Sequence, residues 1–152
     1  MSVIDNIYPG MKKDVMAFLE KAQELDAFIY SGYRSFEKQE WLYEQGRTRP
    51  GEIVTYAKPG QSWHNFGTAI DMAFKNKKNE WTWDSNKWKE LGKLGESFNL
   101  HWGGRWGWKK TDKPHFERNY GQTLEKLKGI YLIRHNILDV YAYLDSWQKE
   151  KA

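Results

Sequence analysis

Hydrophobic positions near the start of the chain recur every three or four residues, as one face of a helix requires. The run follows Pro9 and Gly10 and consists of Met11, Val15, Phe18, Leu19, Ala22 and Leu25. It predicts a helix over residues 11–25. A second helix is predicted over residues 36–45, because Ser35 can cap its first turn and Gly46 can end it.

Three short segments carry the β-branched and aromatic residues that are typical of strands. They are residues 27–33 (AFIYSGY), residues 67–74 (GTAIDMAF), which end at a turn over residues 75–79, and residues 115–117 after Pro114. Residues 48–61 contain two Pro-Gly pairs and are predicted to form a long loop. Loops of this length in a compact domain are often functional.

The second half of the chain returns to helical spacing. Asp84 can cap a helix that carries Trp88, Leu91, Leu94 and Phe98. Residues 100–108 are rich in glycine and tryptophan and predict an irregular segment or a short strand. Residues 122–149 predict two helices with a break near Gly129 or Asn136. Helices and strands are mixed without regular alternation, which favours the α+β class.

Composition restricts the chemistry that the chain can carry. Its 152 residues suit one compact domain, and 16 % aromatic residues argue against disorder. No apolar run approaches the length of a membrane span. The absence of cysteine excludes disulfides, thiolate metal sites and a cysteine nucleophile. A metal would therefore need histidine, aspartate, glutamate or backbone oxygen, and only four histidines are available.

The first candidate site lies in residues 62–71 (SWHNFGTAID). His64 is at the edge of the loop, and Asp71 lies inside an apolar strand, where a carboxylate is costly unless it is paired or binds a metal. Gly67 and Ala69 share the strand face of Asp71 and would leave room beside it. Alternatively, Asp71 caps a turn or pairs with an arginine, and His64 is an ordinary loop histidine.

The second candidate site lies in residues 112–117 (DKPHFE), where Asp112 precedes His115 by three residues. His64, Asp71 and His115 would suit zinc as three nitrogen and oxygen ligands, with water in the fourth position. Asp112 would then be free to act as a general base toward this water. Taken alone, the Asp112–His115 spacing is a weak signal, because a turn aspartate near a surface histidine is common.

Together the clusters resemble the zinc peptidases of the D-Ala-D-Ala carboxypeptidase (VanY-like) and L-alanyl-D-glutamate endopeptidase family, which includes bacteriophage endolysins. The shared pattern is Ser62-x-His64-x-x-Gly67-x-Ala69-x-Asp71, followed by Asp112-x-x-His115. Other segments similar to the family follow its order: residues 31–35, Gln39, residues 42–43, 45–47, 58–61, 102–104 and 114–117. The resemblance covers residues 29–117.

This resemblance implies a peptidase that acts on the peptide stem of bacterial peptidoglycan. His64, Asp71 and His115 would bind zinc, Asp112 would be the general base, and Arg34 would stabilise the developing oxyanion. Without the resemblance, Arg34 would be interpreted as a structural partner of a carboxylate. The implied fold is a small, mostly antiparallel sheet with helices packed around it, similar to D-Ala-D-Ala peptidases and to the hedgehog signalling domain.

Candidate substrate contacts carry alternative explanations. Ser62 could donate a hydrogen bond to the substrate or simply cap the loop, and Gln39 could face the site or be an exposed helical residue. Trp106 and Trp108 would suit an aromatic wall beside a peptide cleft. Trp102 is expected in the core.

Four other residues lie near the motifs without a role in them. Many relatives carry an acidic residue after the Gly103-Gly104 pair, whereas this chain has Arg105, which reverses the charge on this loop. Glu117 shares the strand face of His115, but the family pattern does not require it as a ligand. His101 and His135 have no partner motif and are expected to be packing or surface residues.

Residues 118–152 lie outside the resemblance. We expect a single domain, with residues 1–117 as a catalytic core and residues 118–152 as a helical extension packed on it. Residues 1–10 do not resemble a signal peptide, so we expect synthesis in the cytoplasm and action on the cell wall after release. The net charge of +4 is compatible with an anionic wall. We expect a monomer.

Three activities are compatible with this sequence. The resemblance favours an L-alanyl-D-glutamate endopeptidase, because similar short relatives are often endolysins with this activity, and a D-Ala-D-Ala carboxypeptidase is the alternative. A non-catalytic module that retains the metal is a third interpretation, but such a module would not need Asp112. Nucleic-acid binding has no supporting motif, and we expect no nucleic-acid partner.

Overall fold

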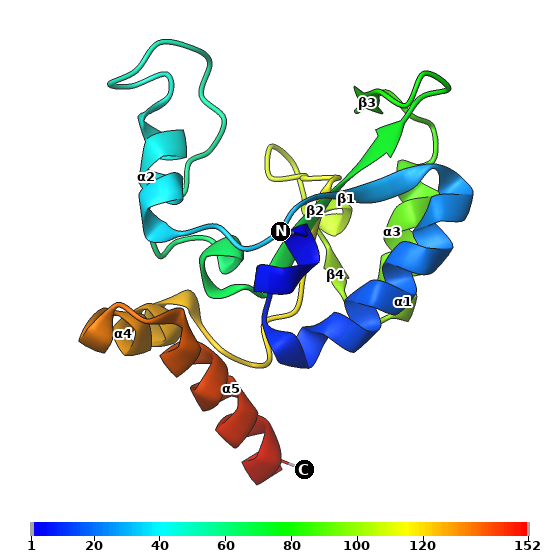
Figure 1. Cartoon of the computed structure of the whole chain (residues 1–152). Helices are drawn as coiled ribbons and strands as arrows, with labels where there is room; N and C mark the ends of the chain where they lie inside the picture. Colours follow the sequence, from blue (N-terminus) through cyan, green and yellow to red (C-terminus); the bar gives the residue numbers. More distant parts are fainter. Residues whose placement is uncertain (1, 152) are drawn as a thin grey trace.

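The computed structural model describes residues 2–151 and confirms the α+β class (Figure 1). Its helices are α1 (Lys12–Ala22), α2 (Phe36–Glu44), α3 (Trp88–Ser97), α4 (Leu124–Arg134) and α5 (Ile137–Lys151). Its strands are β1 (Ala27–Ser31), β2 (Ala69–Lys75), β3 (Trp81–Thr82), β4 (His101–Trp102) and β5 (His115–Glu117). Helices α1 and α3 lie beside the sheet, whereas α2 and the loop after it form an arm that stands apart from it (Figure 1).

All strand pairs of the sheet are antiparallel, in the order β1-β2-β5-β4, with β3 paired to β2. The register places Asp71 of β2 opposite His115 of β5 and opposite Ser31 of β1. The sheet therefore brings together residues that lie far apart in the sequence. This register determines the geometry of the candidate site.

Local signals in the sequence place most helix boundaries correctly. The first helix forms as α1, followed by a short 3₁₀ turn over Gln23–Leu25. The Ser35 Oγ accepts a hydrogen bond from the Lys38 N–H (3.0 Å) at the start of α2. The two C-terminal helices break beside Asn136, and Gly129 lies within α4.

The predicted cap of α3 is wrong. Helix α3 begins at Trp88 with Lys87 in the cap position, three residues beyond the start that a cap at Asp84 predicts. The reason is the short strand β3, which the sequence did not indicate: it pairs with β2, and the chain must turn after Thr82 before a helix can start. In that turn the Asp84 N–H donates to the Thr82 Oγ1 (3.1 Å).

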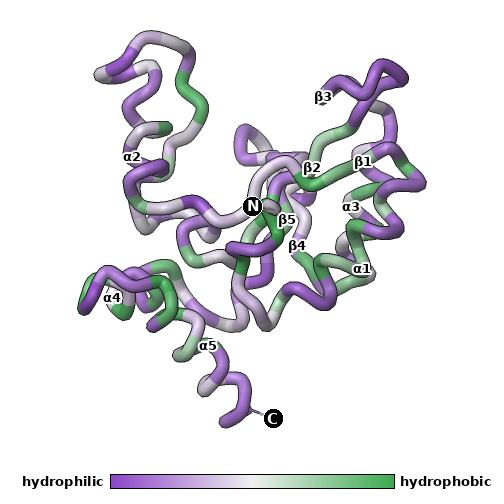
Figure 2. Tube along the Cα trace, in the orientation of Figure 1, coloured by the Kyte–Doolittle hydropathy of each residue, from purple (hydrophilic) through white to green (hydrophobic). Residues whose placement is uncertain are grey.

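A single hydrophobic cluster joins α1, the sheet, α3 and the C-terminal helices. Phe18 of α1 packs against Phe116 of β5 with ring centroids 5.1 Å apart. Parts of the strands are hydrophobic, whereas the helices mix hydrophobic and hydrophilic positions (Figure 2). This is the pattern of helices that cover a sheet with one face only. Within residues 2–151, no helix has the length and apolar character that crossing a membrane requires.

Helix α5 packs against the N-terminal segment and the turn before β2, whereas Tyr131 of α4 stacks on Phe36 of α2. The Tyr141 Oη donates to the Asn6 carbonyl (2.8 Å), and the Gln148 Nε2 donates to the Tyr8 Oη (2.7 Å). Gly67 has a φ of +72°, and a Cβ there would overlap the Tyr141 hydroxyl. Gly67 is therefore required by a left-handed turn and by contact with α5, and the expected role of leaving room beside Asp71 is wrong.

Truncating a buried side chain of α5 is expected to destabilise the whole protein. Leu144 is fully buried in the core, so Leu144→Ala should lower the free energy of unfolding by about 2–5 kcal/mol. Urea denaturation measures this change. Leu138→Ala is the matched control, because Leu138 lies on the same helix but is 63 % exposed. Equal stabilities of the two variants would contradict the packing of α5 on the core.

Candidate metal centre

Three separate segments supply the side chains of the centre. His64 lies on the 3₁₀ turn η4 (Trp63–Phe66), which begins after Ser62, while Asp71 lies in the middle of β2 and His115 begins β5. One ligand atom of each residue lies within 4.8 Å of those of the other two. The structure thus brings together the three residues that the motifs suggested as metal ligands.

Each of these side chains is oriented by a hydrogen bond on the side away from the others. The His64 Nδ1 lies 2.8 Å from the Gly32 carbonyl, and the His115 Nε2 lies 2.7 Å from the Glu117 Oε1. We assign a proton to each of these ring nitrogens, because the partner atoms only accept. The Asp71 Oδ2 accepts from the Ser31 Oγ (3.0 Å). The His64 Nε2, the Asp71 Oδ1 and the His115 Nδ1 are left facing one another.

The spacing of these free atoms fits zinc. The Asp71 Oδ1 lies 3.3 Å from the His64 Nε2 and 3.6 Å from the His115 Nδ1. In a tetrahedral zinc site with bonds of 2.0–2.1 Å, neighbouring ligand atoms are about 3.3 Å apart. Two imidazoles and one carboxylate are also a donor set that zinc accepts, and three protein ligands leave a position for water or substrate.

The electrostatics of the cluster reflect its burial and its mixed charge. Burial opposes ionisation of Asp71, but the two histidines hold its pKa well below its ordinary value. Burial likewise opposes protonation of His115, yet its bonds to Asp71 and Glu117 raise its pKa to about 9. The carboxylates therefore favour a positive charge at this position, and a bound metal would displace the proton and supply that charge itself.

Asp112 and Arg34 line the same cleft as this cluster. The Arg34 Nη2 is 3.7 Å from the Asp71 Oδ2, so the guanidinium faces the centre from the segment after β1. Burial lowers the pKa of Arg34 while Asp71 and Asp112 oppose the shift, and a guanidinium remains charged in proteins. Burial against the cleft raises the pKa of Asp112, although its side chain also reaches solvent.

The backbone around Asp112 depends on Gly103. The carbonyl of Asp112 accepts from the His115 N–H (3.2 Å), and the carbonyl of Gly103 accepts from the Asp112 N–H (3.0 Å). A Cβ at Gly103 would overlap the Asp112 carbonyl oxygen. The close approach of these two segments fixes the turn that holds Asp112 next to His115.

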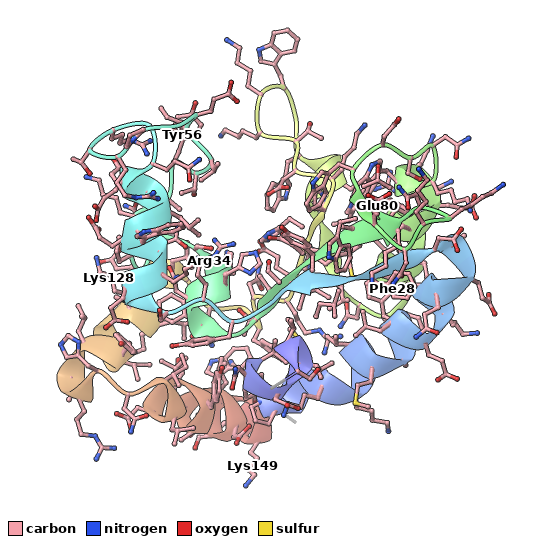
Figure 3. All side chains as sticks on the ribbon, turned by 45° about the horizontal axis from the view of Figure 1, so that its top comes forward. Phe28, Arg34, Tyr56, Glu80, Lys128 and Lys149 are labelled. Carbon is pink, nitrogen blue, oxygen red and sulfur yellow. The ribbon has the colours of Figure 1, made fainter. Side chains whose placement is uncertain are left out.

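The His-Asp-His cluster, Arg34 and Asp112 form the floor of a cleft of about 410 Å³. The arm contributes one wall, with Leu42, Val54, Thr55 and Ala57, and the sheet side contributes Tyr30, Trp83 and Trp106. In Figure 3, Arg34 lies at the base between the arm, marked by Tyr56, and the hairpin that carries Glu80. A peptide placed between the two walls would meet the His-Asp-His cluster, Arg34 and Asp112.

The candidate substrate contacts are only partly placed in this cleft. Ser62 and Trp106 line it, and the Trp106 ring centroid is 5.0 Å from that of His115. The Ser62 Oγ also accepts from the His64 N–H (3.2 Å), so it caps η4 as well. Trp108 does not line the cleft and is 85 % exposed, which corrects its expected place in an aromatic wall.

Gln39 has a structural position that its motif did not reveal. It is fully buried and absent from the lining of the cleft, so it is not a substrate contact. Its Oε1 accepts from the Arg34 Nη1 (3.1 Å) and from the Asn65 Nδ2 (3.3 Å), while its Nε2 donates to the Ala57 carbonyl (2.7 Å). Gln39 therefore fixes the guanidinium of Arg34 and ties the loop of the arm to η4.

The remaining residues near the motifs lie as follows. Arg105 forms two bonds to Glu96 (2.9 and 2.8 Å) and does not line the cleft, so the reversed charge falls outside it. His101 and His135 are exposed and take no part in the cluster, and Trp102 is buried in the core. Glu117 supports His115, and its position two residues later on the same strand face was the signal for this role.

Glu117 should tune metal affinity without binding the metal. Glu117→Gln removes the charge that orients the His115 ring, and outer hydrogen bonds of this kind are worth about 10–100-fold in metal affinity. Competition with a chelator of known affinity measures the loss. Glu80→Gln, on the exposed turn before β3, is the control. Unchanged zinc affinity in Glu117→Gln would show that the bond to His115 does not contribute.

Three convergent nitrogen and oxygen donors beside a partly exposed carboxylate are the arrangement of a metallohydrolase. A comparison with known protein families identifies the group of metallohydrolases to which the chain belongs. The chain belongs to the VanY family of D-alanyl-D-alanine carboxypeptidases, whose model matches residues 6–132.

Individual relatives agree with this assignment. The chain is 38 % identical over 128 residues to the peptidoglycan L-alanyl-D-glutamate endopeptidase CwlK of Bacillus subtilis, with 77 % of this chain and 76 % of CwlK covered. The L-Ala D-Glu endopeptidase ChiX of Serratia marcescens has a similar fold, with a TM-score of 0.53, 18 % identity and coverage of 78 % and 84 %. The D,D-pentapeptidase VanY of the VanB-type resistance cassette, solved with Zn(II), also has a similar fold. Its TM-score is 0.55 at 19 % identity, with 91 % of this chain and 83 % of that chain covered.

Proposed function

We propose that this protein is a zinc-dependent peptidase that cleaves the stem peptide of bacterial peptidoglycan between L-alanine and D-glutamate. The observation that carries the proposal is the convergence of the His64 Nε2, the Asp71 Oδ1 and the His115 Nδ1 on the floor of a cleft that also contains Asp112 and Arg34. The similarity to CwlK supports the endopeptidase over a D-Ala-D-Ala carboxypeptidase.

His64, Asp71 and His115 would hold the zinc ion. Bound there, zinc polarises the scissile carbonyl and makes a water molecule acidic enough to react at neutral pH. Asp112 takes a proton from the attacking water and can return it to the leaving amine. The guanidinium of Arg34 donates hydrogen bonds to the oxyanion that develops on the former carbonyl. Gln39 holds this guanidinium in place, so little reorganisation is needed when the charge forms.

The raised pKa of Asp112 suits the role of a base. A carboxylate that is partly desolvated binds a proton more readily than one in water, so proton transfer from the nucleophile costs less. A binding module of the same fold would have no use for such a group. The presence of Asp112 in the cleft therefore supports catalysis over ligand binding alone.

Mass spectrometry of purified muropeptides after digestion tests the proposed bond. A new free amino terminus on D-glutamate is expected. Loss of a terminal D-alanine would instead establish a carboxypeptidase. Intact muropeptides after incubation with the zinc-loaded protein would exclude both peptidase activities.

A further inference from the structure

An exposed cluster of aromatic side chains stands at the edge of the cleft. Tyr30 of β1 makes edge-to-face contacts with Trp81 of β3 and with Trp83, at ring-centroid distances of 5.1 and 5.0 Å. These three rings, here called the aromatic platform, are each 43–48 % exposed. Exposed aromatic surface gathered in one place is typical of an interaction site.

The platform is attached to the sheet and to the buried Trp88. Trp81 lies opposite Lys75 in the β2–β3 pair, and the carbonyl of Trp83 accepts from the Nε1 of the buried Trp88 (3.1 Å). Trp88 in turn packs edge-to-face on Phe74 of β2, with ring centroids 4.7 Å apart. Because the rings already pack on one another, binding to them would cost less side-chain entropy than binding to isolated side chains.

The platform is continuous with the candidate metal centre. Tyr30 and Trp83 line the same cleft as His64, Asp71 and His115. Trp83 also lines a neighbouring depression together with Asp112 and Pro114. A substrate that is cut at the metal centre and extends past Asp112 would therefore pass over Trp83.

Given the proposed function, the chemistry of peptidoglycan identifies what extends in that direction. The stem peptide is attached to the glycan strand through its L-alanine, so the bond between L-alanine and D-glutamate lies one residue from the sugar. Cleavage of that bond at the floor of the cleft forces the sugar to lie at its edge. We propose that the aromatic platform binds the glycan strand of peptidoglycan.

Aromatic rings suit this ligand better than they suit the rest of the stem. The pyranose rings of the strand carry N-acetyl groups and present C–H faces that pack on the flat faces of tryptophan and tyrosine. The stem beyond D-glutamate carries carboxylates, for which uncharged rings are poor partners. Among residues 2–151, the cation that lies over the platform is Lys75, whose Nζ is 4.8 Å from the Trp81 ring, and it leaves Tyr30 and Trp83 as uncharged surface.

The test compares two substrates with the same peptide. One is the disaccharide–tripeptide of peptidoglycan, and the other is the tripeptide with an acetyl group in place of the sugar. In Trp83→Ala, the loss in kcat/KM for the disaccharide substrate should exceed the loss for the acetylated peptide by about tenfold, the effect of one aromatic contact. Trp41→Ala is the matched control, because Trp41 is 47 % exposed but lies on α2 and does not line the cleft.

A second variant keeps the test decisive if Trp83→Ala folds poorly. Tyr30→Ala removes the central ring and should shift the substrate preference in the same direction, while its zinc content and melting temperature report the state of the fold. Equal losses for both substrates in the two folded variants would overturn the glycan assignment while leaving the peptidase intact. If wild-type protein with zinc cuts neither substrate, the proposed function fails first, so the two failures are distinguishable.

Discussion

Replacing His64 by alanine is expected to abolish stoichiometric zinc binding and to lower kcat/KM by roughly 10³-fold, since the charge stabilisation that a metal provides is worth several kcal/mol. His64 is buried, and its Nε2 faces the Asp71 Oδ1 at 3.3 Å. A water molecule could not replace the imidazole, whose orientation is held by the hydrogen bond from its Nδ1 to the Gly32 carbonyl. Metal analysis of the purified variant, beside wild-type protein with about one zinc per chain, measures the effect.

His101→Ala is the matched control for this experiment. His101 begins β4, is exposed, and is not part of the cluster around Asp71. Its variant should retain the zinc content and the activity of the wild type. A His64→Ala protein that binds zinc with wild-type affinity would remove His64 from the ligand set.

Replacing Asp112 by asparagine should separate catalysis from metal binding. The amide has the size of the carboxylate but cannot take a proton, so kcat should fall by about 10²–10⁴-fold. Zinc content should remain at about one per chain, because Asp112 does not belong to the group of facing ligand atoms. Steady-state kinetics on muropeptides together with metal analysis give both quantities.

Asp84→Asn provides the control for Asp112→Asn, since Asp84 is exposed in the turn before α3. A fully active Asp112→Asn protein would exclude Asp112 as the base. Loss of zinc along with activity would show that Asp112 acts through the turn that it shares with Gly103 and His115.

Signals confined to a few neighbouring residues were sufficient for much of the fold. Ser35 caps α2, as its hydroxyl and position predict, because capping needs only groups within one turn. Asp84 failed as a cap since the pairing of Trp81 with Lys75 on another strand decides where the chain is free to turn. The predicted role of Gly67 was wrong for the same reason, because the residue that contacts it, Tyr141, lies far away in the sequence.

The candidate site shows the same division. The motif spacing identified the three facing side chains, and the register of β2 and β5 places two of them opposite each other. The sequence did not indicate which tryptophan lines the cleft or that Gln39 is buried. Both depend on how the loop of the arm and the segment after Gly104 fold in space. The aromatic platform had no motif at all, because its rings come from β1, from β3 and from the segment directly after β3.

The three proposed zinc ligands come from η4, β2 and β5, so a bound ion would tie separate segments of the chain together. In a sequence without cysteine, such an ion takes the place of a disulfide as a reversible cross-link. Unlike a disulfide, this link would resist reducing agents and would open in acid or in the presence of a chelator. The melting temperature should therefore rise with free zinc.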